Sequence, residues 1–176
     1  RPMDLRWIFY HSSLVWGQTK PTQQHLLVGE NLALMTTRKV EAGSFAHATV
    51  VSTLAECHSV SMKEINYVMP AFRYVKSDIL GMSKTVKISN LRMDAVERLT
   101  SSLTDQAIPP VEEVFSYVCA ILYSTTYRTR FKKSLKSFFP HICRPKSSDL
   151  FNQLAYLGSK VINCLLLNID DTQIRP

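Results

Sequence analysis

Glycine is scarce in this chain, with only five among 176 residues. Nucleotide-binding loops need glycine to bring the backbone close to phosphates, and neither GxGxxG nor GxxxxGKS/T is present. The hydrolase signature GxSxG and the metalloprotease signature HExxH are also absent. These absences predict that the segment is not itself an enzyme. Acidic residues without a partner at recognisable spacing should be structural or solvated, and these include Asp4, Glu30, Glu41, Glu56 and Glu64.

Cysteine is also sparse, and Cys57, Cys119, Cys143 and Cys164 lie far apart without a CxxC pair. This spacing predicts neither a disulfide framework nor a metal centre, and it is typical of a reducing compartment. The adjacent pair Cys57 and His58 is isolated, so we interpret it as an ordinary loop pair rather than as metal ligands.

Long apolar runs are missing as well, since none approaches the roughly 20 residues that a membrane helix needs. The chain begins without an initiator methionine or a signal-peptide pattern, which suggests a segment of a larger polypeptide. We therefore expect a cytoplasmic domain with no membrane partner, and no cofactor or metal ion within this segment.

What the sequence does contain is local positive charge. The net charge is +7, from 21 basic and 14 acidic residues, and residues 125–146 include seven basic side chains and no acid. Interleaved aromatic residues suit polyanion binding, because phosphates attract lysine and arginine while the rings anchor the element beneath. A solvated helix face and a surface that docks onto an acidic neighbouring domain remain alternatives. The basic residues are Arg128, Arg130, Lys132, Lys133, Lys136, Arg144 and Lys146.

Residues 1–90 predict mainly strands, because runs rich in β-branched and aromatic residues alternate with glycine- or serine-containing breaks. Pro70 removes a hydrogen-bond donor from one run, so that strand should lie at an edge or contain a bulge. The connections look too short and polar for helical crossovers, which favours a small, mostly antiparallel and twisted sheet. A short helix is expected at 23–28, and strands are expected at 5–10, 31–37, 48–54, 66–75 and 85–88.

Residues 91–170 predict mainly helices that pack against this sheet, which makes residues 1–176 a single α+β domain. Asn90 is a candidate N-cap, and the pair Pro109 and Pro110 is typical of a helix start. A last helix is expected from residue 149 to about residue 168.

The basic segment predicts a helix with two parallel rows of side chains. Tyr127, Phe131 and Leu135 recur at i, i+4 spacing and should be buried. Arg128, Lys132 and Lys136 form a cationic row next to that apolar stripe.

These residues resemble those of one known family. The resemblance is carried by RPMDLRWIFYH, GENLALMTTRK, SMKEINYVMPAFRYV and PVEEVFSYVCAILYSTTYRTRFKKSLKSFFPHICRPKSSDLFNQLAYLGSKVINCLLL. These segments are similar to the C-terminal specificity domain of type ISP restriction-modification enzymes and related large bacterial DNA methyltransferases. The most specific matches are the corner at 124–128, Phe139 with Pro140, and the stretch 154–158. Arg73 stands where that family usually has an apolar residue.

The resemblance implies that this domain holds a DNA duplex and selects the site at which an adenine methyltransferase domain of the same polypeptide acts. The parent polypeptide would then use S-adenosylmethionine, and it would use ATP and magnesium where a nuclease and a translocase are also present. The implied partners are double-stranded DNA and the methyltransferase domain, in a bacterial cytoplasm. A protein-docking domain whose basic face binds an acidic partner domain, without reading bases, stays open as the alternative.

Candidate DNA contacts follow from residue type and position. Base edges are read by basic or polar side chains at strand ends and in loops, whereas phosphates are held by a basic face. The basic helix should either clamp phosphates or face the methyltransferase domain, and we expect the DNA-binding groups to converge on one concave surface. The candidate base readers are Arg38, Lys39, Ser61, Lys63, Asn66, Arg73 and Lys76, and the candidate phosphate contacts are Arg128, Arg130, Lys132, Lys133 and Lys136.

Overall fold

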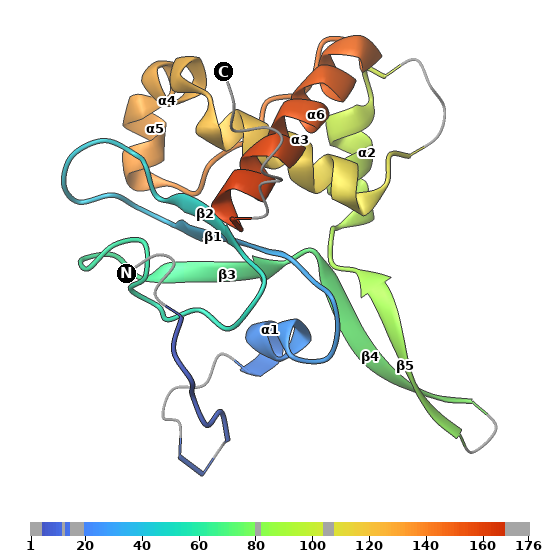
Figure 1. Ribbon diagram of the computed structural model, residues 1–176. Coiled ribbons are helices and arrows are strands. Elements are labelled where there is room, and N and C mark those ends of the chain that lie inside the picture. Colours follow the sequence, from blue (N-terminus) through green and yellow to red (C-terminus); the bar gives the residue numbers. More distant parts are fainter. Residues whose placement is uncertain (1–4, 12, 15–19, 80–81, 104–107, 168–176) are drawn as a thin grey trace.

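Strands form the first half of the molecule, in two antiparallel sheets (Figure 1). The computed structural model describes residues 5–11, 13–14, 20–79, 82–103 and 108–167. The larger sheet has the strand order β2-β1-β3, and the smaller one is the β4-β5 hairpin. A short helix, α1 (Lys20–Gln23), and the 3-10 turn η1 (Gln24–Leu26) come before β1. The strands are β1 (Ala33–Thr37), β2 (Ala48–Val51), β3 (Asn66–Pro70), β4 (Phe72–Ile79) and β5 (Met82–Ser89).

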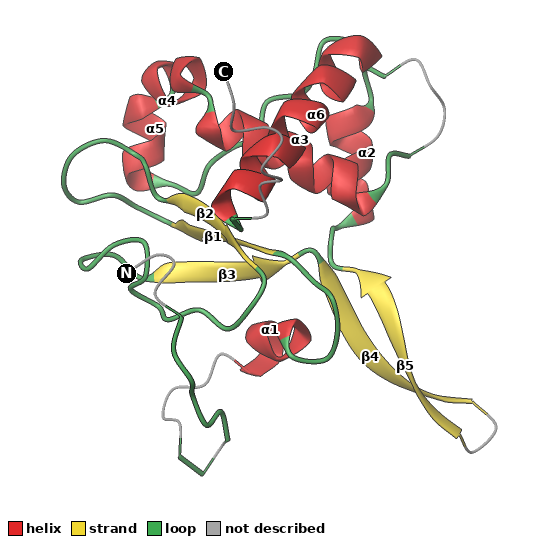
Figure 2. Cartoon of the chain, viewed as in Figure 1, coloured by secondary structure: helices red, strands yellow, loops and turns green. Residues whose placement is uncertain are grey.

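Helices form the second half and cover one face of the larger sheet (Figure 2). α3 begins directly after Pro110, as predicted. The predicted cap of α2 was wrong, because Arg92 lies at the N-cap and the Asn90 side chain donates instead to the Pro70 carbonyl, at 2.7 Å. The helices are α2 (Met93–Thr100), α3 (Val111–Tyr123), α4 (Thr125–Arg130), α5 (Lys132–Ser137) and α6 (Ser148–Leu165). The α+β prediction, with antiparallel strands first and helices second, is confirmed.

The central strand β1 is covered on both faces. Leu26 packs with Ala33 and Met35 on one side, and Val50 of the neighbouring β2 packs with Phe115 of α3 on the other. Burial on both faces explains why β1 does not show the polar alternation of a half-exposed strand.

The predicted strand at 66–75 is two strands that meet at Ala71. The buried Ala71 donates its N–H to the Leu32 carbonyl, at 2.7 Å, and its carbonyl accepts the N–H of Asn90, at 2.9 Å. These bonds lead the chain out of the larger sheet and into the hairpin. Pro70 ends β3 at the edge of the sheet, which confirms its predicted edge position.

α3 and α6 pack at unusually close range. A Cβ atom at Gly158 would lie 1.8 Å from the Ser116 carbonyl oxygen, so only glycine fits at this contact. Tyr117, the residue after Ser116, stacks its ring on that of Phe151 with centroids 5.1 Å apart. The close pair forms the helical layer above the sheet (Figure 1).

The predicted strand at 5–10 was wrong. Residues 5–10 have no strand pairing, and Trp7 and Phe9 are fully or largely exposed. Strand-forming residue types are insufficient here because no described segment pairs with them.

No helix in the described part of the chain is long and apolar enough to cross a membrane.

Candidate nucleic-acid interface

α4 and α5 present a basic surface above a buried aromatic anchor. The side chain of Ser124 caps α4 by accepting the N–H of Tyr127, at 3.2 Å. The predicted single helix changes geometry at Phe131, but the N–H groups of Phe131 and Leu135 still make i to i−4 hydrogen bonds. Tyr127 and Leu135 are buried as predicted, and Phe131 packs against their cluster. The exposed cations, called the α4–α5 basic surface below, are Arg130, Lys132, Lys133 and Lys136.

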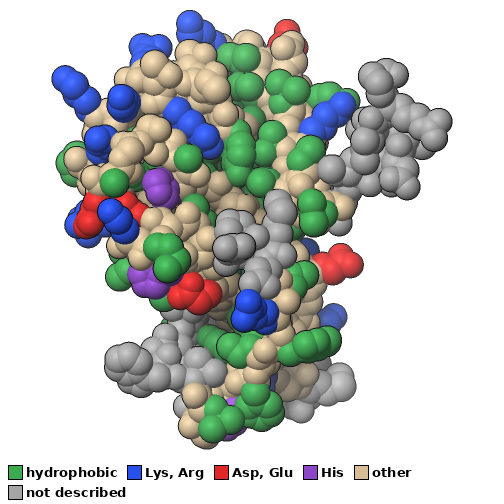
Figure 3. All heavy atoms as spheres, turned by 60° about the vertical axis from the view of Figure 1, so that its left-hand side comes forward, with side chains coloured by type: hydrophobic (Ala, Val, Ile, Leu, Met, Phe, Trp, Pro, Cys, Tyr) green, Lys and Arg blue, Asp and Glu red, His purple; other side chains and the backbone are tan. Residues whose placement is uncertain are grey.

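α4 and α5 lie on the left-hand side of Figure 1, which is turned forward in Figure 3. Many lysine and arginine side chains lie in the upper left of that view. None of the four cations of the α4–α5 basic surface forms an ion pair within the part of the chain that the structure describes. The segment itself contains no acid to neutralise them. This surface can therefore bind a polyanion without first breaking an intramolecular pair.

Arg128 differs from its neighbours because the fold already uses its guanidinium. Its Nε donates to the Leu122 carbonyl, at 2.6 Å, and its guanidinium carbon lies 5.0 Å from the centre of the Tyr123 ring. The guanidinium also lies over Phe45, at 5.9 Å, and burial lowers the pKa of Arg128. Arg128 thus joins α4 to the end of α3 and to the β1–β2 loop, and we leave it out of the proposed phosphate contacts.

The β1–β2 loop brings two candidate readers next to α5. Arg38 and Lys39 are exposed directly after β1. The next residue, Val40, donates its N–H to the Lys136 carbonyl, at 3.0 Å, and packs into the cluster of Tyr127 and Leu135. Residues far apart in sequence are thereby brought together, so that Arg38 and Lys39 extend the α4–α5 basic surface.

Lys39 also forms an ion pair with Glu41, at 3.0 Å. Both side chains are more than half exposed, at 64% and 53%. An exposed pair of this kind contributes only about 0–1 kcal/mol, so a phosphate can replace Glu41 at little cost.

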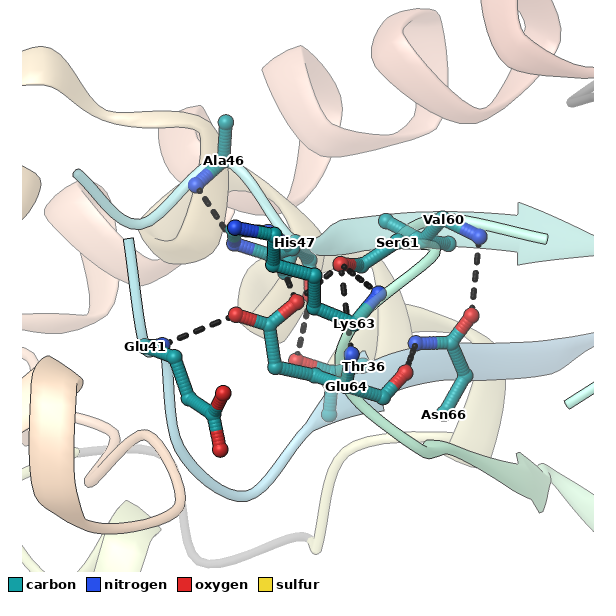
Figure 4. Close-up of polar contacts among 9 residues, drawn as sticks. All are labelled: Thr36, Glu41, Ala46, His47, Val60, Ser61, Lys63, Glu64 and Asn66. Carbon is teal, nitrogen blue, oxygen red and sulfur yellow. Dashed lines mark hydrogen bonds and ion pairs between the residues drawn. The ribbon is translucent and has the colours of Figure 1, made fainter. Parts of the chain in front are cut away.

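A buried carboxylate, Glu64, ties the β1–β2 loop to the loop between β2 and β3. One of its oxygens accepts the N–H of Glu41, at 2.8 Å, and the other accepts the Ser61 hydroxyl (Figure 4). His47 Nε2 lies 3.9 Å from the same carboxylate. The hydrogen bond from Ser61, followed by that from Glu41, lowers the pKa of Glu64 despite its burial.

Sequence reasoning missed this role of Glu64. Ser61 and Glu64 do have the S-x-x-E spacing at which such side chains commonly exchange hydrogen bonds. That spacing was the available signal, but the contact with Glu41 depends on the fold.

Ser61 and Asn66, both candidate base readers, are occupied within their own loop. Asn66 is 5% exposed; its Oδ1 accepts the Val60 N–H at 2.8 Å, and its Nδ2 donates to the Glu64 carbonyl at 3.2 Å. Short polar side chains in loops often bond to nearby backbone in this way. We therefore remove both from the proposed DNA contacts, while Lys63 in the same loop is exposed.

The two remaining candidates, Arg73 and Lys76, lie elsewhere. They are exposed on β4, and β4 and β5 extend away from α4 and α5 toward the opposite end of the molecule (Figure 1). The prediction that the DNA-binding groups converge on one concave surface is therefore wrong. One group of cations lies on the side of α4, α5 and the β1–β2 loop, and the other group lies on the β4–β5 hairpin.

One cluster of metal-ligand types occurs in the described residues. Ligand atoms of Glu56, Cys57 and His58 lie within 4.8 Å of one another. The Glu56 carboxylate accepts hydrogen bonds from the Cys57 thiol, at 3.2 Å, and from the His58 N–H, at 2.7 Å. Its oxygens are therefore already hydrogen-bonded within the loop. The hydrogen bond to Glu56 raises the pKa of the Cys57 thiol, which disfavours the thiolate that a metal needs.

The sequence model described as "Type ISP C-terminal specificity domain" matches residues 1–174. The chain belongs to this family. The match includes both the strands and the helices of the specificity domain, so it spans every basic surface described above.

A solved structure shares the fold of this specificity domain. It is the ATP-dependent Type ISP restriction-modification enzyme LlaBIII bound to DNA, with a TM-score of 0.60 and 18% sequence identity. The similarity covers 77% of this chain and 8% of the LlaBIII chain. Among curated proteins, no sequence matches the specificity domain significantly.

Proposed function

We propose that this specificity domain recognises a particular sequence in double-stranded DNA and thereby directs a DNA adenine methyltransferase to its target. The observation that carries the proposal is the family match over residues 1–174. The description of LlaBIII as bound to DNA supports DNA as the class of ligand.

The distribution of charge supports a division between holding and reading DNA. The α4–α5 basic surface lies on paired helices with a buried anchor, as suits contacts to phosphates at constant spacing. Arg38 and Lys63 lie in loops, and the hairpin cations lie on a two-stranded ribbon. Side chains in both kinds of position can reach base edges.

The chemistry of methylation belongs to the parent polypeptide in this proposal. The match covers 8% of the LlaBIII chain, which leaves room for other domains in such a polypeptide. In this proposal S-adenosylmethionine, ATP and magnesium would bind in those other domains. The domain's own part is to fix where the methyltransferase domain meets the duplex.

Selection from a random-sequence duplex library tests the proposal. The chain is expected to enrich one sequence and to bind it more tightly than a scrambled duplex, by about 4 kcal/mol or more if it reads DNA unaided. Equal affinity for every duplex, together with binding to an acidic partner domain through the α4–α5 basic surface, would instead support the docking function.

A further inference from the structure

The β4–β5 hairpin extends from the rest of the molecule as a two-stranded ribbon (Figure 1). Its strands pair from Phe72 opposite Ser89 to Ile79 opposite Met82, so each strand has eight residues. At about 3.3 Å per residue, a strand of this length spans about 26 Å. The ribbon can therefore present side chains to a partner along its length while its inner end stays on the domain.

Hydrogen bonds hold the inner end of the ribbon in one direction. The buried side chain of Asn31 donates to the Phe72 carbonyl, at 2.8 Å, and accepts the Phe72 N–H, at 3.1 Å. The Tyr74 N–H donates to His25 Nδ1, at 3.2 Å, and the Tyr74 hydroxyl donates to the Glu30 carbonyl, at 2.7 Å. The domain thus determines how the ribbon is presented.

The ribbon carries four exposed cations. None of them has an ion pair or a side-chain hydrogen bond within the described residues, although Lys87 Nζ lies 4.1 Å from the centre of the Phe72 ring. Unpaired like charges do not stabilise an isolated pair of strands, so their presence suits an external polyanion. The cations are Arg73, Lys76, Lys84 and Lys87.

The register divides these side chains between the two faces of the ribbon. Residues directly opposite each other in an antiparallel pair share a face. Lys76 lies opposite Thr85, and Lys87 lies opposite Tyr74, so these four side chains share one polar face. Arg73 and Lys84 lie on the other face, which also carries the half-buried Val75 and Val86.

We infer that the ribbon enters the major groove of the target duplex, with Lys76, Thr85 and Lys87 turned toward the base edges. The major groove, about 12 Å wide, admits a two-stranded ribbon directly, whereas the minor groove, about 6 Å wide, must first be widened by bending the DNA. Lysine donates to guanine O6 and N7, and threonine can bond to a base or contact the thymine methyl group. Arg73 and Lys84, on the opposite face, contact flanking phosphates. This inference rests on the proposed function and deepens it, because it names the groove and adds Lys84, Thr85 and Lys87.

Binding of the selected duplex by the whole chain tests the inference. In the double variant K76A/K87A, the ratio of affinities for selected and scrambled duplexes should fall at least about tenfold, since each good base contact discriminates by about 1–3 kcal/mol. Replacing purines of the site by 7-deazapurines, which removes the major-groove N7 atom, should weaken binding to the wild-type chain and have little further effect on the variant. The variant K160A, which changes an exposed lysine on α6, serves as the matched control and should behave like wild type. Thermal melting verifies that the variants fold.

The outcomes separate this inference from the proposed function. If the wild-type chain selects a sequence and K76A/K87A selects it equally well, the ribbon does not read DNA, but the proposed function stands. Weakening by 3-deazapurines alone would place the contacts in the minor groove and overturn the inference. If the wild-type chain selects no sequence, the proposed function fails, and the inference fails with it.

Discussion

At the scale of single residues, several polar side chains near the sheet are used by the fold rather than offered to a ligand. Asn66 and Ser61 bond within their loop, and Arg128 bonds to the Leu122 carbonyl. Glu64 connects two loops that carry exposed candidate readers. Glu64 thus helps to position Lys63 and the β1–β2 loop.

Glu64 should make stability depend on pH. Hydrogen bonds hold its pKa below the ordinary value of 4.5, so its contribution is complete above about pH 4.5 and is lost as pH falls through the lowered pKa. Glu64→Gln should lower the unfolding free energy at pH 7 by about 1–3 kcal/mol and flatten its fall in acid. Urea unfolding between pH 7 and pH 3 measures both, with Glu97→Gln, an exposed glutamate on α2, as control. Equal pH profiles for wild type and Glu64→Gln would exclude this role.

Arg38 should read a base. Its side chain is exposed directly after β1, next to the α4–α5 basic surface. Arg38→Ala should cost on the order of 1–3 kcal/mol at one position of the recognised sequence and relax the preference there. Duplex selection with the variant measures this, and Arg98→Ala, on α2, is the control. An unchanged preferred sequence would remove Arg38 from the readers.

At the scale of elements, the packing of α6 on α3 supports the helices that carry the α4–α5 basic surface. α6 packs tightly on α3, and α3 leads through the capped turn at Ser124 into α4 and α5. The β1–β2 loop then packs onto α4 and α5. A substitution in the helical layer should therefore first lower the unfolding free energy of the domain.

Gly158→Ala should be destabilising even though alanine favours helix more than glycine does. The added Cβ would lie 1.8 Å from a backbone oxygen of Ser116, which cannot move without separating the helices. We expect a loss of about 1–3 kcal/mol in the unfolding free energy, opposite in sign to the gain of roughly 1 kcal/mol from propensity alone. Denaturant unfolding measures it, with the exposed α6 position Asn163→Ala as control. A stabilised Gly158→Ala variant would show that the helices are not in this close contact.

The α4–α5 basic surface should bind all duplexes alike. The double variant K132A/K133A should weaken selected and scrambled DNA equally, because both lysines would contact phosphate. Its salt dependence should be shallower by about two in the slope of log affinity against log salt, one for each lost contact. Binding titrations at several salt concentrations measure this. Unchanged DNA affinity would favour docking of this surface onto the methyltransferase domain.

At the scale of the whole molecule, the cations form two separate surfaces rather than one. The hairpin lies at the far end of the domain from α4 and α5 (Figure 1). A duplex held at both places would cross the domain, with phosphates bound and one base read by Arg38 at the helical end, and further bases read by the ribbon.

Separate surfaces should act independently. The free-energy losses of K132A/K133A and K76A/K87A should add to within about 0.5 kcal/mol in the combined variant, since distant sites without shared partners are additive. Titration of one duplex with the four proteins measures the sum. A combined loss far smaller than the sum would mean that the two surfaces compete for the same stretch of DNA.

The sequence alone determined what depends on local pattern. The family follows from the resemblance of whole segments to the type ISP specificity domain. Strands first and helices second, the edge position of Pro70, and the burial of Tyr127 and Leu135 follow from residue type and spacing. Such properties repeat along the chain at the period of a helix or strand, so they can be predicted without knowing any distant contact.

Only the tertiary structure decided which polar groups remain free and where they gather. Asn66, Arg128 and Asn90 have the residue types of a reader, a phosphate contact and a helix cap, but other segments of the chain satisfy their hydrogen bonds. Residues 5–10 have the composition of a strand without a described partner to pair with. Hydrogen bonds and charges depend on neighbours brought together by folding, and no local period encodes which neighbours those will be.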